Sequence, residues 1–260
     1  MSDYVQDLFG LDGQVAVVTG ATGVLCGQMA QGLAAAGAKV VVVGRDHDRG
    51  ADRVAQIEAA GGTAMFCSAS ATSREDVEQV LATTLEAYGR VDILVNGAGM
   101  NRATPFLEIT EEEWNQILDV NLRGAMLACQ VFGQYFLDNN VPGSIINLGS
   151  MSGITPLSRV FTYSVSKAAL HNLTLNLARE WAPRGIRVNA LAPGFFPAEQ
   201  NRKILTEDRV KSIFTHTPMG RFGESEELIG ATLLLASRRA GSFITGIVLP
   251  VDGGFAAMTI

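Results

Sequence analysis

Short runs of branched aliphatic residues alternate along this chain with longer stretches whose apolar residues recur at spacings of three and four. The runs show little polar alternation, as expected of strands that are covered on both faces. They lie at residues 15–18, 40–43, 93–95, 145–148, 188–191 and 247–249, and the predicted helices cover residues 26–36, 48–60, 74–88, 111–138, 163–182 and 225–236. This β-α order predicts parallel strands joined by right-handed crossovers, with helices on both faces of one sheet.

The composition is that of a folded chain without an internal boundary. Of the 260 residues, 47% are hydrophobic and 18% are charged, which excludes a disordered chain. No Pro-rich or Ser-rich linker and no internal repeat divides the sequence, so we expect a single domain over residues 1–260. Within it, the irregular segment at 193–223 is a candidate lid over a site at the carboxyl edge of the sheet.

Charge and cysteine content exclude several classes of partner. The net charge of -6 has the wrong sign for a nucleic-acid-binding surface. The three cysteines lack a CxxC spacing and fit buried, reduced thiols, and the three histidines lack metal-ligand spacing, so no metal is expected. The first dozen residues show no secretory signal, and the uncharged stretch at 13–38 contains six glycines, which disfavours a membrane span. We therefore expect a cytoplasmic protein without membrane or nucleic-acid partners.

A glycine-rich turn follows the first predicted strand. The chain reads Thr19-Gly20-Ala21-Thr22-Gly23-Val24-Leu25 there and continues through Cys26 into a helix. Glycines let the backbone approach a pyrophosphate, and a helix N-terminus offers unpaired N–H groups and a positive dipole end. The turn predicts a dinucleotide site, although a glycine turn that serves only tight packing has the same pattern. The third glycine of the dinucleotide fingerprint would fall at Cys26.

A basic residue follows the second predicted strand. Arg45 stands where an acidic residue would otherwise accept a hydrogen bond from the ribose 2′-OH, so a 2′-phosphate can be accommodated. This favours NADP(H) over NAD(H). In the alternative, Arg45 is a solvated loop residue that balances Asp46 and Asp48.

A tyrosine, a lysine and a serine are predicted to meet at the carboxyl edge of the sheet. Tyr163 and Lys167 stand four apart on one predicted helix and therefore share a face. Ser150 follows one strand, and Pro193-Gly194 follows another. Because ligands of open parallel sheets bind at this edge, we expect these strand ends to form one crevice.

In their order and spacing, these motifs resemble the short-chain dehydrogenase/reductase family over essentially the whole chain. The matching motifs also include Asn96-Gly97-Ala98-Gly99 and Asn121. The resemblance implies one doubly wound, Rossmann-type α/β domain with a seven-stranded parallel sheet, usually assembled as a homotetramer. It implies hydride transfer between NAD(P)(H) and a secondary alcohol or ketone. The cofactor-binding residues it implies are Thr19, Gly20, Thr22, Gly23, Leu25, Arg45, Ser70, Asn96, Gly97, Ala98, Tyr163, Lys167, Pro193, Gly194 and Phe196.

The chemistry of a ketone reduction assigns roles to the same residues. Negative charge builds on the carbonyl oxygen, so a proton donor and a hydrogen bond must be in place, and Tyr163 is the expected donor. Lys167 and the nicotinamide are expected to lower the pKa of Tyr163 from its free value of about 10. In family terms, Lys167 also holds the nicotinamide ribose, Ser150 orients the carbonyl, and Asn121 supports a water in a proton relay. The structural alternatives are that Ser150 only ends a strand and that Asn121 only satisfies backbone groups.

Four positions depart from the family pattern. They are Cys26 at the third glycine, Gly97 where a second Asn is usual, Ser70 near the place of an Asp that contacts adenine, and Ala198 where a Thr is common. None is a proton-transfer residue, so the departures concern cofactor affinity rather than chemistry.

The substrate is predicted from looser signals. Residues 193–202 and 252–255 resemble a subgroup that acts on sugar acids, such as mannonate/fructuronate or gluconate oxidoreductases. Ser150 and Ser152 are substrate candidates, and four basic residues are candidate carboxylate ligands, although each also fits a simple surface charge: Arg102, Arg159, Arg202 and Lys203. A 3-oxoacyl-carrier-protein reductase is the second enzymatic reading. A catalytically inactive nucleotide-binding regulator is the non-enzymatic one, because fold does not imply function.

Overall fold

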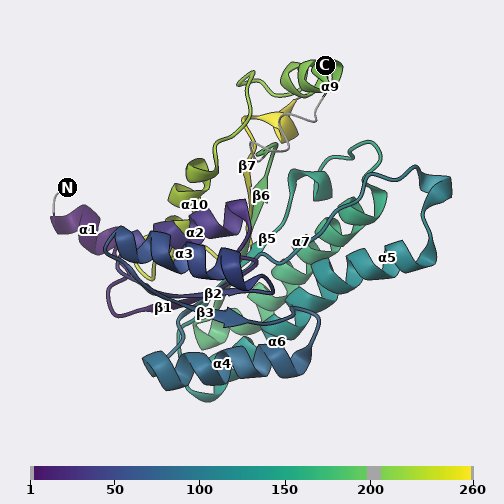
Figure 1. Cartoon of the computed structure of the whole chain (residues 1–260). Coiled ribbons are helices and arrows are strands. Elements are labelled where there is room, and N and C mark those ends of the chain that lie inside the picture. The colour runs from purple at the N-terminus through teal and green to yellow at the C-terminus, as the bar shows by residue number, and fades with distance from the viewer. Residues whose placement is uncertain (1–2, 198–205, 259–260) are drawn as a thin grey trace.

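A seven-stranded, fully parallel sheet forms the centre of the protein, in a computed structural model that describes residues 3–197 and 206–258 (Figure 1). The strand order is β3-β2-β1-β4-β5-β6-β7. The strands are β1 (Val15–Thr19), β2 (Lys39–Gly44), β3 (Thr63–Ser68), β4 (Ile93–Asn96), β5 (Ser144–Leu148), β6 (Arg187–Pro193) and β7 (Val248–Val251). The predicted doubly wound α/β fold is confirmed.

Helices cover both faces of this sheet. On one face lie α2 (Val24–Ala35), α3 (His47–Ala59) and α10 (Leu228–Ala236), and on the other lie α4 (Arg74–Tyr88), α5 (Glu111–Leu118), α6 (Gly124–Asp138) and α7 (Phe161–Trp181) (Figure 1). The short helix α1 (Asp3–Phe9) precedes β1. None of the helices formed by the described residues combines the length and apolar character needed to cross a lipid bilayer.

Successive residues of a strand point to opposite faces of the sheet and pack into two separate hydrophobic cores. Ala16 and Val18 of β1 pack with Leu33 of α2 on one face, whereas Val17 packs with Phe132 of α6 on the other. All five residues are fully buried. This two-sided burial explains why most strands read as unbroken aliphatic runs.

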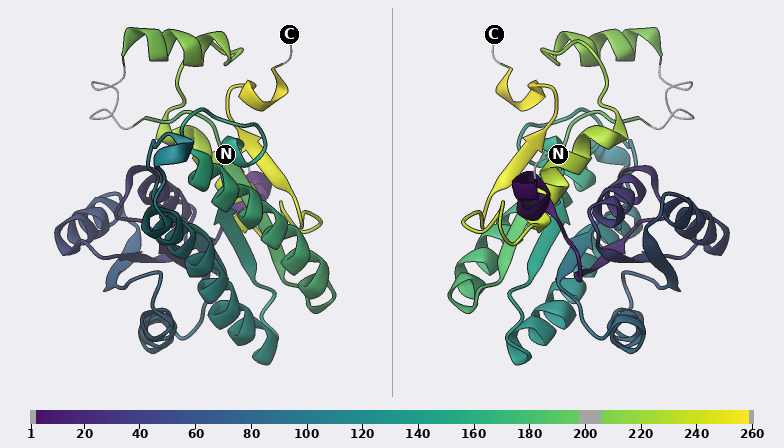
Figure 2. Two further views of the ribbon diagram at one scale, coloured as in Figure 1. Left: turned by 90° about the vertical axis from the view of Figure 1, so that its right-hand side faces the viewer. Right: turned by 90° about the vertical axis from the view of Figure 1, so that its left-hand side faces the viewer.

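Strand β3 and helix α1 were not predicted, and two of the predicted segments differ from the structure. The helix expected over residues 111–138 is interrupted by a π-helical turn, η2 (Asp119–Arg123), in which the Gly124 N–H donates to the Asp119 carbonyl five residues back. The segment expected to be irregular, 193–223, contains helix α9 (Glu207–Thr215), which begins where the Thr206 hydroxyl accepts the Arg209 N–H. Helix α9 stands beyond the carboxyl edge of the sheet, outside the two helical layers (Figure 2).

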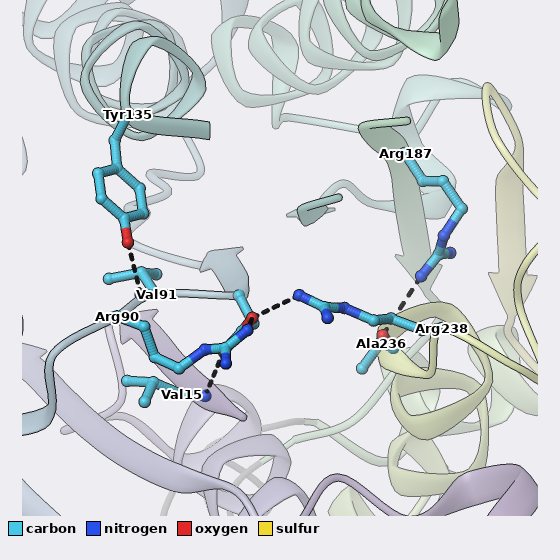
Figure 3. A network of polar contacts seen from close by, with 8 residues as sticks. Val15, Arg90, Val91, Tyr135, Arg187, Ala236 and Arg238 are labelled. Carbon is cyan, nitrogen blue, oxygen red and sulfur yellow. Dashed lines mark hydrogen bonds and ion pairs between the residues drawn. The ribbon is translucent and has the colours of Figure 1, made fainter. Parts of the chain in front are cut away.

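A buried carboxylate joins distant segments at the opposite, amino edge of the sheet (Figure 3). Asp92, just before β4, accepts the backbone N–H of Val15 at 2.9 Å and two bonds from Arg90 at 2.9 and 2.7 Å, and it pairs with Arg238. Its side chain is 0% exposed. The network ties β1, β4 and the segment after α10 together, so it stabilises the end of the sheet that lies away from the site.

Candidate active site

The glycine-rich turn crosses from β1 to α2 at the point where the strand order reverses. Gly20 has a φ of 73°, and a Cβ there would approach the Gly97 carbonyl oxygen to 2.7 Å. Gly23 precedes α2, and no side chain caps the N-terminus of that helix. The first N–H groups of α2, which include that of Leu25, therefore lie open to a ligand, and the turn fits the pyrophosphate of a dinucleotide.

Thr19 links this turn to the loop after β4. Its hydroxyl oxygen accepts hydrogen bonds from the N–H groups of Gly97 at 3.0 Å and Ala98 at 3.3 Å. The same hydroxyl donates a hydrogen bond to the Val95 carbonyl oxygen at 3.3 Å. Thr22, in the turn itself, packs against Gly44 at the end of β2. Thr19 and Thr22 thus bring the carboxyl ends of β1, β2 and β4 together.

Cys26 and Gly97 meet at the base of the turn. An ideal Cβ on Gly97 would overlap the Cys26 sulfur and lie 3.3 Å from the Cys26 Cβ. Burial raises the pKa of the Cys26 thiol to about 12, so it stays uncharged. Two of the departures from the family pattern therefore compensate each other: the larger side chain at Cys26 occupies the space left by the missing side chain at Gly97.

Asn96 belongs to a buried polar network below the site. Its amide donates to the Asn147 oxygen at 2.9 Å, and the Asn147 amide donates to the Thr174 hydroxyl at 2.9 Å. This connects β4, β5 and α7, and it fixes the relative height of the strand ends that carry the site.

Tyr163, Lys167 and Ser150 converge, as their positions in the sequence suggest. The Lys167 ammonium lies 5.5 Å from the centre of the Tyr163 ring and donates to the Leu148 carbonyl at 2.6 Å. The Ser150 side chain lies near the Tyr163 phenol and lowers its pKa in the way that a hydrogen-bond donor does. A strand end from β5 and one face of α7 thus place a phenol, a hydroxyl and an ammonium around one point.

The pKa of Tyr163 differs from the sequence expectation. Burial raises the pKa of Tyr163, and the hydrogen bond from Ser150 works in the opposite sense with a smaller effect. Burial also lowers the pKa of Lys167 to about 8. The chain alone therefore keeps Tyr163 protonated at neutral pH, and Lys167 does not by itself bring the phenol to a neutral pKa.

Asn121 sits in the π-helical turn with its amide fully engaged. The amide nitrogen donates to the Met100 carbonyl at 2.9 Å and to the Ser166 hydroxyl at 3.0 Å, and the amide oxygen accepts the Met100 N–H at 2.7 Å. A Cβ on Gly99 would lie 3.4 Å from the Asn121 oxygen and 3.7 Å from the Lys167 nitrogen. Asn121 thus holds the loop after β4 close to Lys167.

Two further predicted cofactor positions lie at the rim. Arg45 is exposed after β2 and forms no ion pair with any residue in the described part of the chain. The alternative in which Arg45 balances Asp46 is not seen as an ion pair, because Asp46 pairs with Arg49 at 3.4 Å. Ser70 follows β3, and its hydroxyl is within 3.0 Å of the Thr72 hydroxyl.

Arg53 is a rim residue that sequence reasoning missed. Its guanidinium donates to the Gly23 carbonyl at 3.4 Å and to Gln56 at 2.9 Å, and it occupies the space where a Cβ on Gly27 would lie. No carboxylate among residues 3–197 and 206–258 pairs with it. Only the packing of α3 against α2 brings it to the glycine turn, so spacing along the chain gave no signal.

The residues after β6 reach the other side of the crevice. Pro193 ends β6, and the Gly194 N–H donates to the Val251 carbonyl at 3.0 Å. Phe196 packs against Gly223 and lines a hollow of about 360 Å³ between this segment and the residues after β7. The lining residues include neither Tyr163 nor Ser150.

The predicted substrate arginines are dispersed. The guanidinium of Arg102 donates to Gln116 at 3.1 Å, and the backbone of Arg159, with a φ of 66°, accepts the Thr104 N–H at 3.0 Å. Arg202 lies outside the described residues. Sequence reasoning missed Arg209 of α9, which donates to Ser158 at 3.3 Å and so joins the candidate lid to the loop before α7.

Ser152 has a buried hydroxyl without a hydrogen-bond partner among the described residues. Its N–H donates to the Ser150 hydroxyl oxygen at 3.1 Å. An unpaired buried hydroxyl retains the capacity for one more hydrogen bond beside Ser150. No three His, Cys, Asp or Glu side chains of the described residues gather as metal ligands would.

Comparison with known proteins agrees with this geometry. Residues 20–256 match a family model described as enoyl-(acyl carrier protein) reductase. The uncharacterized oxidoreductase UxuB of Bacillus subtilis is 40% identical, over 95% of this chain and 96% of its own length. The chain belongs to the short-chain dehydrogenase/reductase family. A 3-oxoacyl-[acyl-carrier-protein] reductase of Synechocystis sp. is 37% identical, over 94% of this chain and 97% of its own.

Solved structures of this family superpose closely. A gluconate 5-dehydrogenase from Burkholderia cenocepacia, in complex with NADP and tartrate, has a TM-score of 0.92 at 31% identity and covers 98% of this chain and 100% of its own. A provisionally named D-mannonate oxidoreductase from Haemophilus influenza with bound NAD has a TM-score of 0.92 at 34% identity, covering 98% and 99%. Relatives of this dehydrogenase/reductase thus bind either nicotinamide cofactor.

Proposed function

We propose that this protein is an NADP(H)-preferring oxidoreductase that transfers hydride between the nicotinamide and a secondary alcohol or ketone of a sugar acid. The observation that carries the proposal is the Tyr163 phenol, with the Lys167 ammonium 5.5 Å from its ring centre and the Ser150 side chain near enough to lower its pKa. This group lies at the carboxyl edge of the sheet, on the same side as the glycine turn that fits a pyrophosphate.

In ketone reduction, the residues of this group donate a proton, stabilise charge and hold the cofactor. Tyr163, kept protonated because its pKa is raised, donates its proton to the carbonyl oxygen. Ser150 donates a second hydrogen bond to that oxygen and stabilises the charge that develops there. Lys167 holds the nicotinamide ribose, and Asn121 keeps the Met100 loop in place beside it. Bound NADP(H) or NAD(H) supplies the hydride and, when oxidised, a positive charge at the site.

The preference for NADP(H) rests on two guanidinium groups at the rim. Arg45 and Arg53 are cations without a carboxylate partner among the described residues, and Arg53 touches the glycine turn itself. A dianionic 2′-phosphate would give both a charge-assisted partner, whereas a ribose hydroxyl would not.

The sugar-acid substrate class rests on the groups over the crevice. The hydroxyl of Ser152, beside Ser150, is buried and has no hydrogen-bond partner among the described residues, and Arg209 of α9 donates to Ser158, next to Arg159 in the loop before α7. A cation at this place suits a carboxylate. Helix α9, which carries Arg209, acts as a lid over the crevice. The gluconate 5-dehydrogenase and the D-mannonate oxidoreductase among the related structures support the same class.

The assembly is a homotetramer in the cytoplasm. Phe161, Val165 and Leu175 of α7 are more than 40% exposed, and Phe106 packs on Phe161 with ring centres 5.3 Å apart. Apolar side chains exposed along one long helix suit a subunit interface. All three cysteines are free, as suits a reducing compartment. Light scattering of the purified protein tests the assembly, and a monomer would contradict it.

One substrate panel tests the reaction and the substrate class together. NADPH oxidation and NADP reduction are measured with keto- and hydroxy-sugar acids, acetoacetyl thioesters and simple ketones. We expect the highest kcat/KM with a sugar acid. The absence of turnover with every carbonyl compound would favour the inactive nucleotide-binding regulator.

A 3-oxoacyl-carrier-protein reductase is the second candidate, favoured by the Synechocystis relative. Such an enzyme needs a basic surface for an acidic carrier protein, and the net charge of -6 makes one less expected. A clear preference for acetoacetyl thioesters in the same panel would select this function over the sugar-acid one.

A further inference from the structure

His171 lies directly under the candidate site without a role in the chemistry described so far. It follows Lys167 by one turn of α7 and is 7% exposed. Its ring nitrogen Nε2 accepts the backbone N–H of Ser150 at 3.4 Å. Because Nε2 accepts, the proton of the neutral ring is on Nδ1.

The two glycines that flank Ser150 make room for this ring. A Cβ on Gly149 would overlap Nε2 of His171, and a Cβ on Gly153 would lie 2.8 Å from its Cε1. The turn at 149–153 therefore wraps over the imidazole, with glycine at the two positions where any other residue would collide with it. The location of the Ser150 hydroxyl depends on a ring that comes from α7.

The charge state of the ring suits an acceptor. Burial and the neighbouring Lys167 ammonium lower the pKa of His171 to about 4. The ring therefore stays neutral at physiological pH and keeps the lone pair that faces the Ser150 N–H.

We propose that His171 is a positioning residue, whose imidazole holds the 149–153 turn so that the Ser150 hydroxyl faces Tyr163. The inference rests on the proposed function, because it acts through the role of Ser150 there. A ring that only filled space would be replaceable by an apolar side chain of similar size, whereas a positioning ring requires an acceptor at Nε2.

Matched variants separate these two cases. His171→Gln keeps an acceptor near the place of Nε2, whereas His171→Leu keeps the volume and removes the acceptor. Asn172→Ala, on the exposed side of the same helix, is the control. Each variant is made in the wild-type and Ser150→Ala backgrounds, and kcat and KM are measured for NADPH oxidation with 5-ketogluconate as the probe. The dissociation constant of NADPH and the melting temperature are measured in parallel.

We expect His171→Leu to lower kcat about tenfold, the scale of one lost hydrogen bond, with NADPH affinity unchanged and with recovery to within about threefold in His171→Gln. In the Ser150→Ala background, His171→Leu should add less than about twofold, because both changes act on one hydroxyl. Equal effects of Leu and Gln, or effects that multiply in the double variant, would overturn the proposal.

Crystal structures of the two variants give a readout that does not depend on the substrate. The proposal expects the distance between the Ser150 and Tyr163 oxygens to increase in His171→Leu and to be kept in His171→Gln. An unmoved 149–153 turn in the Leu variant would refute it even if 5-ketogluconate is not turned over. A wild-type protein inactive on the probe, with a displaced turn in the Leu variant, would instead count against the substrate and leave the positioning role supported.

Discussion

The sulfur of Cys26 fills the space that a side chain on Gly97 would need, so the first turn of α2 and the loop after β4 are complementary in volume. Both residues depart from the usual family pattern. A side chain at position 97 would collide with the Cys26 sulfur, so the glycine at 97 accommodates the cysteine at 26. The floor of the cofactor site therefore keeps its packing although two of its residues are unusual.

This complementarity predicts a rescue. Gly97→Ala should destabilise the protein by about 1–3 kcal/mol through overpacking and weaken NADPH binding. Adding Cys26→Ala should restore more than half of both losses, because it removes the overlapping sulfur and leaves the Thr19 carbonyl oxygen at 3.0 Å and the Cys26 Cβ at 3.3 Å as the nearest neighbours of the new methyl group. Thermal unfolding and NADPH titration measure the two effects. Gly230→Ala, where a Cβ meets no atom within 4 Å, is the control. An additive double variant would refute the complementarity.

The phenol of Tyr163 is predicted to be the proton donor. Tyr163→Phe should lower kcat at least about 100-fold while the melting temperature changes little, because only a hydroxyl is removed. Tyr4→Phe, a change at a residue that is 65% exposed, serves as the control. Turnover close to wild type in Tyr163→Phe would exclude the role.

The lowered pKa of Lys167 predicts the alkaline limit of ketone reduction. The ammonium is present below its pKa of about 8 in the folded protein and is lost above it. We expect kcat/KM for NADPH, which reports groups of the free enzyme, to fall as the pH rises through about 8. A profile that is flat from pH 7 to pH 10 would contradict this.

The same shift has a consequence for stability. The folded state loses the Lys167 proton near pH 8 and the unfolded state near 10.5, so the unfolded state holds more protons between them. The cost of burying the charge is therefore full below pH 8 and disappears as the pH rises. Lys167→Met should abolish turnover at pH 7 without lowering the melting temperature. A clearly lower melting temperature of Lys167→Met at pH 7 would show that the interactions of the Lys167 ammonium outweigh the cost of burying it.

Cofactor preference is predicted to depend on the two rim arginines. Arg45→Gln and Arg53→Gln should each weaken NADPH binding about tenfold or more and change NADH binding less than about twofold, because only NADPH carries the 2′-phosphate. Arg49→Gln removes the same charge from an exposed position on α3 and is the control. If Arg53→Gln weakened NADPH and NADH binding equally, Arg53 would have no part in recognising the 2′-phosphate and would only pack against Gly27.

The amino edge of the sheet is predicted to be a centre of stability without a part in turnover. Asp92→Asn leaves Arg90 and Arg238 without their shared carboxylate and should cost about 3 kcal/mol. Asp7→Asn, which breaks an exposed pair with Arg239, should cost less than about 1 kcal/mol. Urea unfolding measures both. Equal and small costs would mean that the Asp92 network contributes little.

The success of the sequence prediction follows burial. Five strands, β1, β2, β4, β5 and β6, were found because both of their faces are covered. The edge strand β7 is only partly buried and was found from its aliphatic run alone, whereas the other edge strand, β3, was missed because residues such as Met65 and Cys67 are partly buried and break such a run. The order of the elements and the carboxyl-edge location of Ser150, Tyr163 and Lys167 follow from local spacing and from the rules of parallel sheets.

Features that depend on packing between distant segments could not be predicted in this way. Arg53 reaches the glycine turn from α3, and His171 reaches Ser150 from a helix 21 residues further along the chain. The raised pKa of Tyr163 depends on how completely neighbouring elements cover it. Sequence spacing indicates which residues share an edge or a face, but it does not indicate which groups are shielded from water.

The π-helical turn at Asp119–Arg123 restricts how this part of the chain can change in length. A π-helical turn holds one residue more than an α-helical turn, so the deletion of one residue here would restore regular α-helical winding and remove the widened turn that carries Asn121. Asn121 would then lose Met100 and Ser166 together. Surface loops of homologous chains can gain or lose residues freely, whereas at this turn an insertion or a deletion would be selected against.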